Sequence, residues 1–425
     1  MKNNKLLKEW LISPEGRQRL EQLYGQDEGV IHEQAARYGQ LLSAHEEAFG
    51  QGKPLYAISA PGRTEIIGNH TDHNHGQVLA AAVNLDTAAL ASSREDRLVF
   101  LNSAGYPPLK LDLGDLAPQP GEAGSTAALI RGVAARMQAL GYKIGGFDAV
   151  MTSRVMSGSG LSSSAAFEVA VAAIFDALYN GFTLDAKVRA QIGQFAENAY
   201  FGKPSGLMDQ MASSVGGLVA MDFKEEEPRV TALPFSFAAS GFRLIVVDTR
   251  GSHDDLTPAY SAIKSEMQAA ARVMGAEVLR ERDRKAFLHS LSDIIRQAGD
   301  RAALRALHFY NENQRVAKAV EALKGNDLPC FFRMVRQSGL SSWTMLQNLY
   351  AHPQSQPLAL ALALAEEVLA GEGACRVHGG GFAGTTLNFV PDGKVDAFTR
   401  QMDAIFGEGC CHVLDVRAEG AVQVY

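Results

Sequence analysis

The sequence feature that most constrains the fold is a glycine- and serine-rich stretch followed at once by a long apolar helix. The two read MSGSGLSSSAAFEVAVAAIFDALY and cover residues 156–179. Apolar residues recur at helical spacing on two faces of this segment, which predicts a buried helix over about 162–180. The preceding FDAVMTSRV reads as a strand. The pattern therefore predicts a strand, a tight turn and a helix whose N-terminus is anchored in the core.

The turn before this helix has the composition of an anion-binding loop. Gly158 and Gly160 allow a tight turn with exposed backbone N–H groups, and an anchored helix N-terminus adds a partial positive charge that suits phosphate. Ser162 or Ser163 could cap the helix, and the hydroxyls of Ser162, Ser163 and Ser164 could serve phosphate oxygens and Mg²⁺. No lysine follows the second glycine, so this is not a Walker A loop. An ordinary strand-turn-helix packed with small residues is the alternative.

Two carboxylates follow in AENAYFGKPSGLMDQMASS. Glu197 falls on a predicted helix that Gly202 and Pro204 end, and Ser205-Gly206 leads into the next helix N-terminus. Asp209 then lies in a first helical turn, where the helix dipole keeps a carboxylate ionised. One carboxylate could hold Mg²⁺ and the other could accept a proton or orient a hydroxyl. The alternative is that Asp209 only supports the first turn of its helix and that Glu197 faces solvent.

A histidine-rich stretch, GRTEIIGNHTDHNHG, covers residues 62–76 between aliphatic flanks. A zinc site made of His70, Asp72, His73 and His75 has suitable ligand types. Residues that alternate along an ordinary strand or turn do not all converge on one point, however, so a metal site is disfavoured, and a surface loop or the wall of a polar pocket remains. On this interpretation, His73 and His75 serve packing or the surface.

A third glycine cluster lies in CRVHGGGFAGTTLNFV, between a predicted helix and a predicted strand. Three successive glycines exceed what a turn needs. They allow another backbone or a ligand to approach closely.

The length and the changes of pattern along the 425-residue chain predict two domains, because single cores rarely grow past about 300 residues. Residues 1–50 read as a helical extension. Strands and helices alternate through residues 51–224, and KEEEPRV marks the expected boundary. Residues 225–425 form the second domain, helical over about 258–350 and then alternating helix and strand, an α+β pattern.

The charge and the cysteines restrict the location and the partners. A net charge of −7 and a pI of about 5.9 argue against a nucleic-acid or anionic-membrane surface. The longest aliphatic run ends after about nine residues, short of the ~20 that a spanning helix needs. The four cysteines are sparse and lack zinc-ligand spacing, which indicates reduced thiols in a cytosolic protein. The sequence does not determine the oligomeric state, and a monomer is our expectation.

Four segments in this order resemble the GHMP small-molecule kinases, and among these the galactokinases most closely. They are APGRTEIIGNHTDHNHG, SGSGLSSSAAFEVA, GKPSGLMDQMASS and VHGGGFAGTTLNF. The similarity runs from about Tyr56 to the end. It implies an α+β, two-domain fold with an N-terminal mixed-sheet domain, a C-terminal ferredoxin-like α/β-sandwich domain and an active site in the cleft between them.

The resemblance also implies an activity, transfer of the ATP γ-phosphate to the anomeric hydroxyl of galactose with Mg²⁺. By position, Asp209 matches the catalytic aspartate that engages the acceptor hydroxyl, and Arg63 matches the arginine that stabilises charge beside it. The other matched positions are Asn69, His70, Asp72, Gly206 and Tyr260 for the sugar; Gly158, Gly160, Ser162, Ser163 and Ser164 for ATP; and Ser164 and Glu197 for Mg²⁺.

Several positions depart from the usual motif of this family. Glu65 stands where the family has asparagine and Asn69 where it has glutamate, while His73 replaces a tyrosine and Ala383 a glycine. The first two changes form a reciprocal swap, so we hypothesise that these side chains are neighbours. Because the family glutamate contacts a sugar hydroxyl and an amide is shorter and neutral, the swap bears on which sugar is bound.

Three functions therefore remain open from the sequence. The first is galactokinase. The second is a kinase for a related sugar such as N-acetylgalactosamine, arabinose or galacturonate. The third is a sugar- and ATP-binding sensor without catalysis. Because Arg63, Asp209, Ser164 and Glu197 are all present, we predict an active enzyme.

Overall fold

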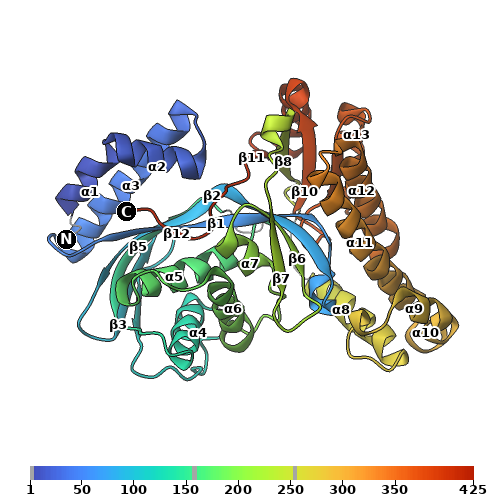
Figure 1. Ribbon diagram of the computed structural model, residues 1–425, viewed down its shortest axis with the longest axis horizontal. Helices are drawn as coiled ribbons and strands as arrows, with labels where there is room; N and C mark the ends of the chain where they lie inside the picture. Colours follow the sequence, from blue (N-terminus) through green and yellow to red (C-terminus); the bar gives the residue numbers. More distant parts are fainter. Residues whose placement is uncertain (1–3, 156–159, 252–255) are drawn as a thin grey trace.

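The computed structural model describes residues 4–155, 160–251 and 256–425, and two β-sheets organise them (Figure 1). The large sheet has the strand order β12-β1-β2-β5-β3-β4, and β6 and β7 extend it from β2. Its strands are β1 (Tyr56–Ile67), β2 (Gln77–Ser93), β3 (Leu98–Ser103), β4 (Leu109–Asp112), β5 (Phe147–Ser153), β6 (Leu218–Asp222), β7 (Arg229–Leu233) and β12 (Val422–Gln423). Paired strands run antiparallel except β3 and β5, which are parallel.

Helices cover both faces of this sheet (Figure 1). One face carries α1 (Asn4–Leu11), α2 (Pro14–Tyr24) and α3 (Glu28–Phe49), and the other carries α4 (Thr126–Ala139), α5 (Ser163–Tyr179), α6 (Ala186–Ala196) and α7 (Met208–Val215). Side chains alternate along β2, so Ala89 and Ala91 join the core with α4 to α6, whereas Ala88 and Leu90 join the core with α1 to α3. The predicted helical start and the predicted buried helix are both confirmed.

A buried carboxylate attaches the N-terminal helices to the sheet. Asp86 on β2 is fully buried and accepts hydrogen bonds from Arg37 Nη1 on α3 at 2.5 Å and from the Tyr24 hydroxyl on α2 at 2.6 Å. Arg417 Nη1 lies 3.5 Å from its second oxygen. Burial alone would raise the pKa of Asp86, but the two guanidinium groups hold it below its usual range. The N-terminal helices are therefore an integral layer of the fold.

The small sheet has the order β11-β8-β10-β9, with every pair antiparallel. Its strands are β8 (Phe242–Asp248), β9 (Ala374–Val377), β10 (Thr385–Pro391) and β11 (Cys411–Leu414). The chain runs from β8 through helices to the β9–β10 hairpin and returns through α14 to β11. This is the βαββαβ connection of a ferredoxin-like domain, as predicted, with additional helices after β8.

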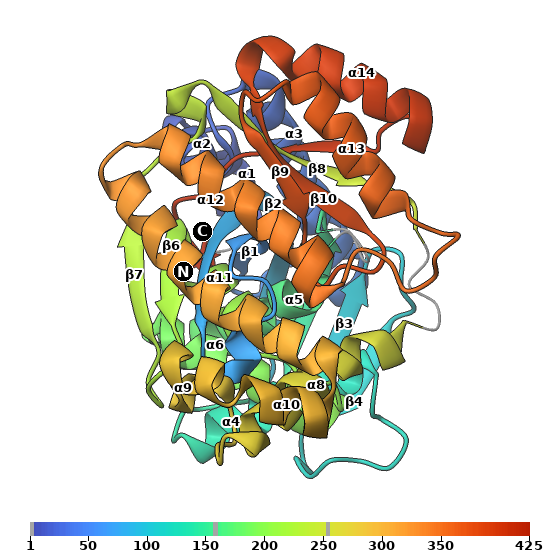
Figure 2. The same ribbon diagram turned by 90° about the vertical axis from the view of Figure 1, so that its right-hand side faces the viewer.

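The helices of this half are α8 (Thr257–Val273), α9 (Arg284–His289), α10 (Leu291–Ala298), α11 (Asp300–Lys324), α12 (Leu328–Ser341), α13 (Pro357–Leu369) and α14 (Val395–Phe406). Leu244 and Val246 of β8 face the core with α11 and α12, whereas Ile245 and Val247 face the core with α13 and α14. Figure 2 shows α12 and α11 crossing in front of the strands. The small sheet is therefore covered on both faces.

Some elements were not anticipated from the sequence. β7 follows the acidic stretch and pairs with β6, so the large sheet continues to Leu233, and β12 near the C-terminus pairs with β1. The domain bounds of 51–224 and 225–425 stay a prediction.

None of the helices in the described ranges combines the length and the apolar character that crossing a bilayer requires.

Candidate active site

One cavity of about 810 Å³ brings together most of the residues predicted from the sequence. From the N-terminal half it is lined by Arg63, Glu65, Asn69, His70, Asp72, His73, Gly160, Ser162, Ser163, Ser164, Lys203, Pro204, Ser205, Gly206, Met208 and Asp209, and from the C-terminal half by Tyr260, Ser261, Lys264, Ser265, Gln268, Gly379 and Gly380. Glu197 lies directly behind this wall, bonded to Ser164. Gly158 lies outside the described residues.

Arg63 and Asp209 form an ion pair in the wall of the cavity. The Nε and Nη2 atoms of Arg63 each lie 2.7 Å from Asp209 Oδ1, and Nη1 donates to the Gly160 carbonyl. The β1–β2 register shifts between Pro61 and Arg63, and the Arg63 N–H then bonds the Leu161 carbonyl at 3.1 Å. This bulge turns Arg63 toward the start of α5.

The electrostatics of this pair keep Asp209 ionised. Burial alone would raise the pKa of the Asp209 carboxyl, but the Arg63 guanidinium and a hydrogen bond from the Ser162 hydroxyl hold it below its usual range. Asp209 lies in the first turn of α7, as predicted, where the helix dipole acts in the same direction. The site therefore presents a carboxylate at neutral pH.

The predicted capping role of the serines at the start of α5 is wrong. Ser162 occupies the N-cap position, but its backbone is left-handed, with φ 55°, and its hydroxyl donates to Asp209 instead of capping the helix. Ser163 and Ser164 follow in the first turn and line the cavity. The N–H groups at this end of α5 are therefore not capped by the Ser162 side chain, which suits an anionic ligand.

Glu197 and Ser164 bring two oxygen donors together beside this turn. Ser164 Oγ lies 3.2 Å from Glu197 Oε1, close to the roughly 3 Å spacing of neighbouring ligands in an octahedron with 2.0–2.1 Å bonds. Lys203 Nζ lies 2.9 Å from the same carboxylate oxygen, and Gln210 Nε2 lies 2.9 Å from the other. Glu197 begins a π-helical turn, Glu197–Phe201, that ends at Gly202 as predicted.

The glycine cluster at 379–381 closes the cavity from the C-terminal half, and its predicted close approach is confirmed. A Cβ on Gly380 would lie 2.6 Å from the Tyr260 ring, and one on Gly381 would lie 2.1 Å from the Asn348 carbonyl oxygen. A Cβ on Gly160 would similarly lie 2.8 Å from Thr385 Oγ1. Only glycine therefore lets the turn at Gly160 and the second domain meet here.

His70 and Asp72 form the wall beside Asp209. His70 Nε2 lies 3.0 Å from the Gly380 carbonyl oxygen, and burial lowers the pKa of His70, so the ring is neutral and donates through Nε2. Burial, reinforced by the charge of Asp209, raises the pKa of Asp72 to about 6. The Asp72 carboxylate packs so closely on Gly206 that a Cβ there would lie 1.7 Å from Oδ2.

The zinc alternative receives no support from this geometry. Among the described residues, the grouped candidate ligands are Asp403, Cys410 and Cys411, on α14 and at β11, and no histidine of the 62–76 stretch is among them. His70 is directed to a carbonyl, and Asp72 accepts the backbone N–H of His73 at 2.8 Å.

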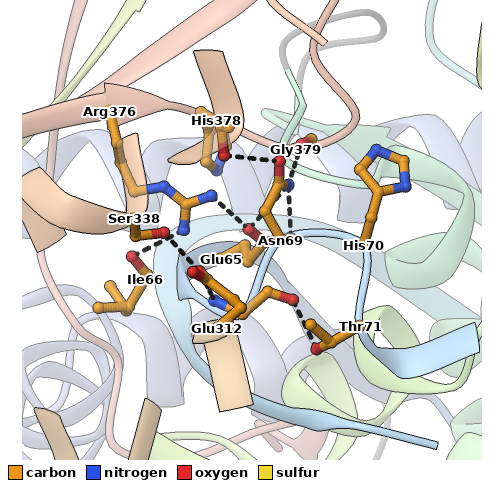
Figure 3. A network of polar contacts seen from close by, with 12 residues as sticks. Glu65, Ile66, Asn69, His70, Thr71, Glu312, Ser338, Arg376, His378 and Gly379 are labelled. Carbon is orange, nitrogen blue, oxygen red and sulfur yellow. Dashed lines mark hydrogen bonds and ion pairs between the residues drawn. The ribbon is translucent and has the colours of Figure 1, made fainter. Parts of the chain in front are cut away.

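Glu65 and Asn69 are neighbours, as hypothesised (Figure 3). Asn69 Nδ2 lies 3.1 Å from Glu65 Oε1 and 2.7 Å from the Gly379 carbonyl oxygen. Its Oδ1 accepts from Asn348 at 2.8 Å and from Ser342 at 3.3 Å. Because Asn69 is almost fully buried and every polar group of its amide has an internal partner, a sugar contact requires it to exchange one of them. Its sugar contact stays a prediction.

Residues of the second domain hold the end of β1 and the loop that follows it (Figure 3). Arg376 on β9 is fully buried, with Nη2 2.9 Å from Glu65 Oε1 and Nη1 3.0 Å from the Ile66 carbonyl oxygen. Glu312 on α11 accepts the Gly68 N–H at 3.0 Å. The positions of the residues that follow on the loop therefore depend on an interdomain network that the motifs do not reveal.

Helix α8 forms a further wall of the cavity, of which only Tyr260 was predicted from the sequence. Tyr260 on α8 donates its hydroxyl to the Gly381 carbonyl at 2.7 Å. Ser261, Lys264, Ser265 and Gln268 lie along the same helix and also line the cavity. Residues four apart share one helix face, so the Tyr260 assignment could have pointed to Lys264. Lys203, within the GKPSG segment, was likewise not singled out.

Known proteins resemble this chain over nearly its whole length. Family models described as the galactokinase galactose-binding signature and the GHMP kinases N terminal domain match residues 43–93 and 128–217. Galactokinase from Streptomyces coelicolor is 33% identical over 375 residues, 87% of this chain and 92% of that protein. The chain belongs to the galactokinase family of GHMP kinases. Galactokinase from Haemophilus influenzae is 34% identical over 81% of this chain and 87% of its own.

Solved structures agree with membership of the galactokinase family. Lactococcus lactis galactokinase complexed with galactose matches with a TM-score of 0.79 and 25% identity, covering 91% of this chain and all of that one. A mevalonate kinase matches with a TM-score of 0.60 at 13% identity, covering 84% of this chain and 98% of its own, which shows a shared fold. The galactokinase-family fold predicted from the motifs is therefore confirmed.

Proposed function

We propose that this chain transfers the γ-phosphate of ATP to the anomeric hydroxyl of galactose, giving ADP and galactose 1-phosphate. The observation that carries the proposal is the ionised Asp209 carboxylate, held by Arg63 against the serine-rich start of α5 in one cavity. Membership of the galactokinase family supports the choice of sugar. The presence of both Arg63 and Asp209, paired in the cavity, favours an enzyme over a catalytically silent sensor.

Asp209 is suited to orienting the acceptor. Its lowered pKa makes it a weak base for the resting hydroxyl, but a good hydrogen-bond acceptor that aligns the sugar oxygen with the γ-phosphorus. Phosphoryl transfer passes through a loose transition state, so the hydroxyl proton can leave late, through Asp209. A bond forms between the sugar oxygen and the γ-phosphorus. At the same time the bond between the γ-phosphorus and the β–γ bridging oxygen breaks, and ADP departs.

Positive charge from several sources suits the transferring group. The α5 N-terminus contributes a partial charge, and Arg63 and Lys203 contribute full charges near Asp209. Ser164 and Glu197 have the donor types and the spacing for Mg²⁺ and would hold it. When bound, Mg²⁺ supplies charge neutralisation between the phosphates. His70, Asp72, Gly206 and Tyr260 line the remaining space and are the sugar contacts that we propose.

The test is ATP consumption against a panel of monosaccharides, with Mg²⁺ and with the metal chelated. We expect turnover with galactose that exceeds turnover with glucose, and loss of turnover on chelation. Absence of turnover with every sugar, despite ATP binding, would instead favour a sensor.

The four cysteines are free, which fits the cytosolic location that we also propose.

A kinase for a related sugar is the second candidate, favoured by the internal bonding of Asn69. The swap-back variant, Glu65→Asn with Asn69→Glu, keeps the two side chains adjacent but moves the carboxylate of the cavity wall from position 65 to position 69. We expect relative kcat/KM among galactose, N-acetylgalactosamine and arabinose to change by about tenfold or more for at least one pair. Unchanged preferences across the panel would show that this position does not select the sugar.

The proposed sugar contact by Asp72 predicts a pH dependence. Because the pKa of Asp72 is raised to about 6, its carboxylate is ionised above that pH and protonated below it. The ionised form accepts sugar hydroxyls, so KM for the sugar should rise as the pH falls from 7.5 to 5. The Asp72→Asn variant should have a higher KM without this pH step. The same step in wild type and variant would exclude Asp72 as its cause.

A further inference from the structure

Lys264 places a positive charge on the cavity wall. It lies on α8, partly buried, and lines the cavity with its helix neighbours Ser261, Ser265 and Gln268. Within residues 4–155, 160–251 and 256–425, the Lys264 ammonium group forms neither a hydrogen bond nor an ion pair. An anionic group on a bound ligand could therefore pair with this ammonium group.

The two lysines of the cavity serve different parts of it. Lys203 pairs with Glu197 and lowers the pKa of Asp209, so it lies on the phosphate side. Lys264 instead acts on the pKa of Asp72, a proposed sugar contact, and on that of its neighbour His73. Lys264 therefore lies on the side of the proposed sugar contact Asp72 rather than beside Glu197.

The rest of the sugar wall carries little negative charge to oppose an anionic sugar. Asn69 is a neutral amide. Glu65 is engaged by the buried Arg376, and Asp209 by Arg63. Among the described residues, Asp72 remains the one carboxylate of this wall without a guanidinium partner, and it is ionised above about pH 6, with Lys264 among the charges that lower its pKa. Lys264 is therefore the cationic side chain of this wall that can pair with a negatively charged substituent on the sugar ring.

From this we infer that the acceptor site also admits a galacto-configured sugar acid, whose carboxylate pairs with Lys264. This inference rests on the proposed function, because it uses the same anomeric hydroxyl and the same phosphoryl transfer. Galacturonate is the natural probe, since it differs from galactose only in having a carboxylate in place of the terminal CH₂OH group. Bond making and breaking at phosphorus are the same for both sugars.

The test compares kcat/KM for galactose and galacturonate in wild type, Lys264→Met and Lys264→Arg. We expect wild type to phosphorylate galacturonate, and Lys264→Met to lower kcat/KM for galacturonate at least tenfold more than for galactose, mainly through KM. Lys264→Arg keeps the charge and should retain most galacturonate activity. Lys318→Met, which removes an exposed lysine from α11 outside the cavity, is the matched control and should alter neither sugar. Added salt should weaken galacturonate binding in wild type more than in Lys264→Met.

Each contrary result has a separate meaning. Equal losses for the two sugars, or no galacturonate phosphorylation by wild type that is active on galactose, would overturn the inference. A rise in KM for ATP alone would place Lys264 on the phosphates and would also overturn it. Absence of turnover with both sugars would contradict the proposed function itself.

Discussion

Replacing Asp209 by asparagine should lower turnover by several orders of magnitude while leaving nucleotide binding nearly intact. The amide has nearly the same size, but it is neutral and presents one acceptor oxygen instead of two. It therefore orients the sugar hydroxyl poorly, takes up no proton from it and leaves Arg63 without its counter-charge. The comparison is between the steady-state rate of ADP release and the affinity for a fluorescent ATP analogue.

A matched control separates this effect from a general loss of charge. Asp300 also lies in the first turn of a helix, α11, but is exposed and does not line the cavity. Asp300→Asn should leave both the rate and nucleotide affinity within about twofold. An Asp209→Asn enzyme with a near-normal rate would remove Asp209 from its proposed role. A parallel loss of ATP affinity would instead indicate that the variant damages the nucleotide site.

The sequence was most informative where local pattern and burial act together. The helix at 162–180 was predictable because apolar residues on two faces can only be buried between other elements. The positions of Glu197 and Asp209 followed from glycine and proline signals at the helix ends. The capping prediction for Ser162 failed for a tertiary reason, since Asp209, forty-seven residues away, accepts its hydroxyl.

Other features depend on contacts that no local pattern encodes. β7 is a short, largely exposed strand defined by its pairing with β6 rather than by its own composition. The wall formed by Lys264 becomes visible only when α8 is placed against the histidine-rich loop. Arg376 and Glu312 lie more than 240 residues along the chain from the loop that they hold. Sequence motifs thus located the reacting groups but not the network that positions them.

That network predicts that removing Glu65 destabilises the protein strongly, and more than removing Arg376 does. Glu65→Leu leaves the fully buried Arg376 without its carboxylate, and because a guanidinium cannot lose its proton, the charge stays in the core. We expect the free energy of unfolding to fall by about 3–5 kcal/mol. Arg376→Met should destabilise less, because the remaining Glu65, whose pKa burial already raises, can take up a proton. Urea denaturation of the purified variants measures both changes.

The double variant tests whether the loss of stability in Glu65→Leu comes from the broken ion pair or from lost packing contacts. Glu65→Leu with Arg376→Met replaces a buried ion pair by two apolar side chains, an exchange that is often neutral or stabilising, so it should be more stable than Glu65→Leu alone. Glu372→Leu is the control, since Glu372 is exposed and its ion pair with the partly buried Lys394 is worth about 1 kcal/mol at most. Additive losses in the double variant would mean that each side chain stabilises the loop through separate contacts. Recovery would instead identify the interdomain ion pair as what holds the histidine-rich loop against the second domain.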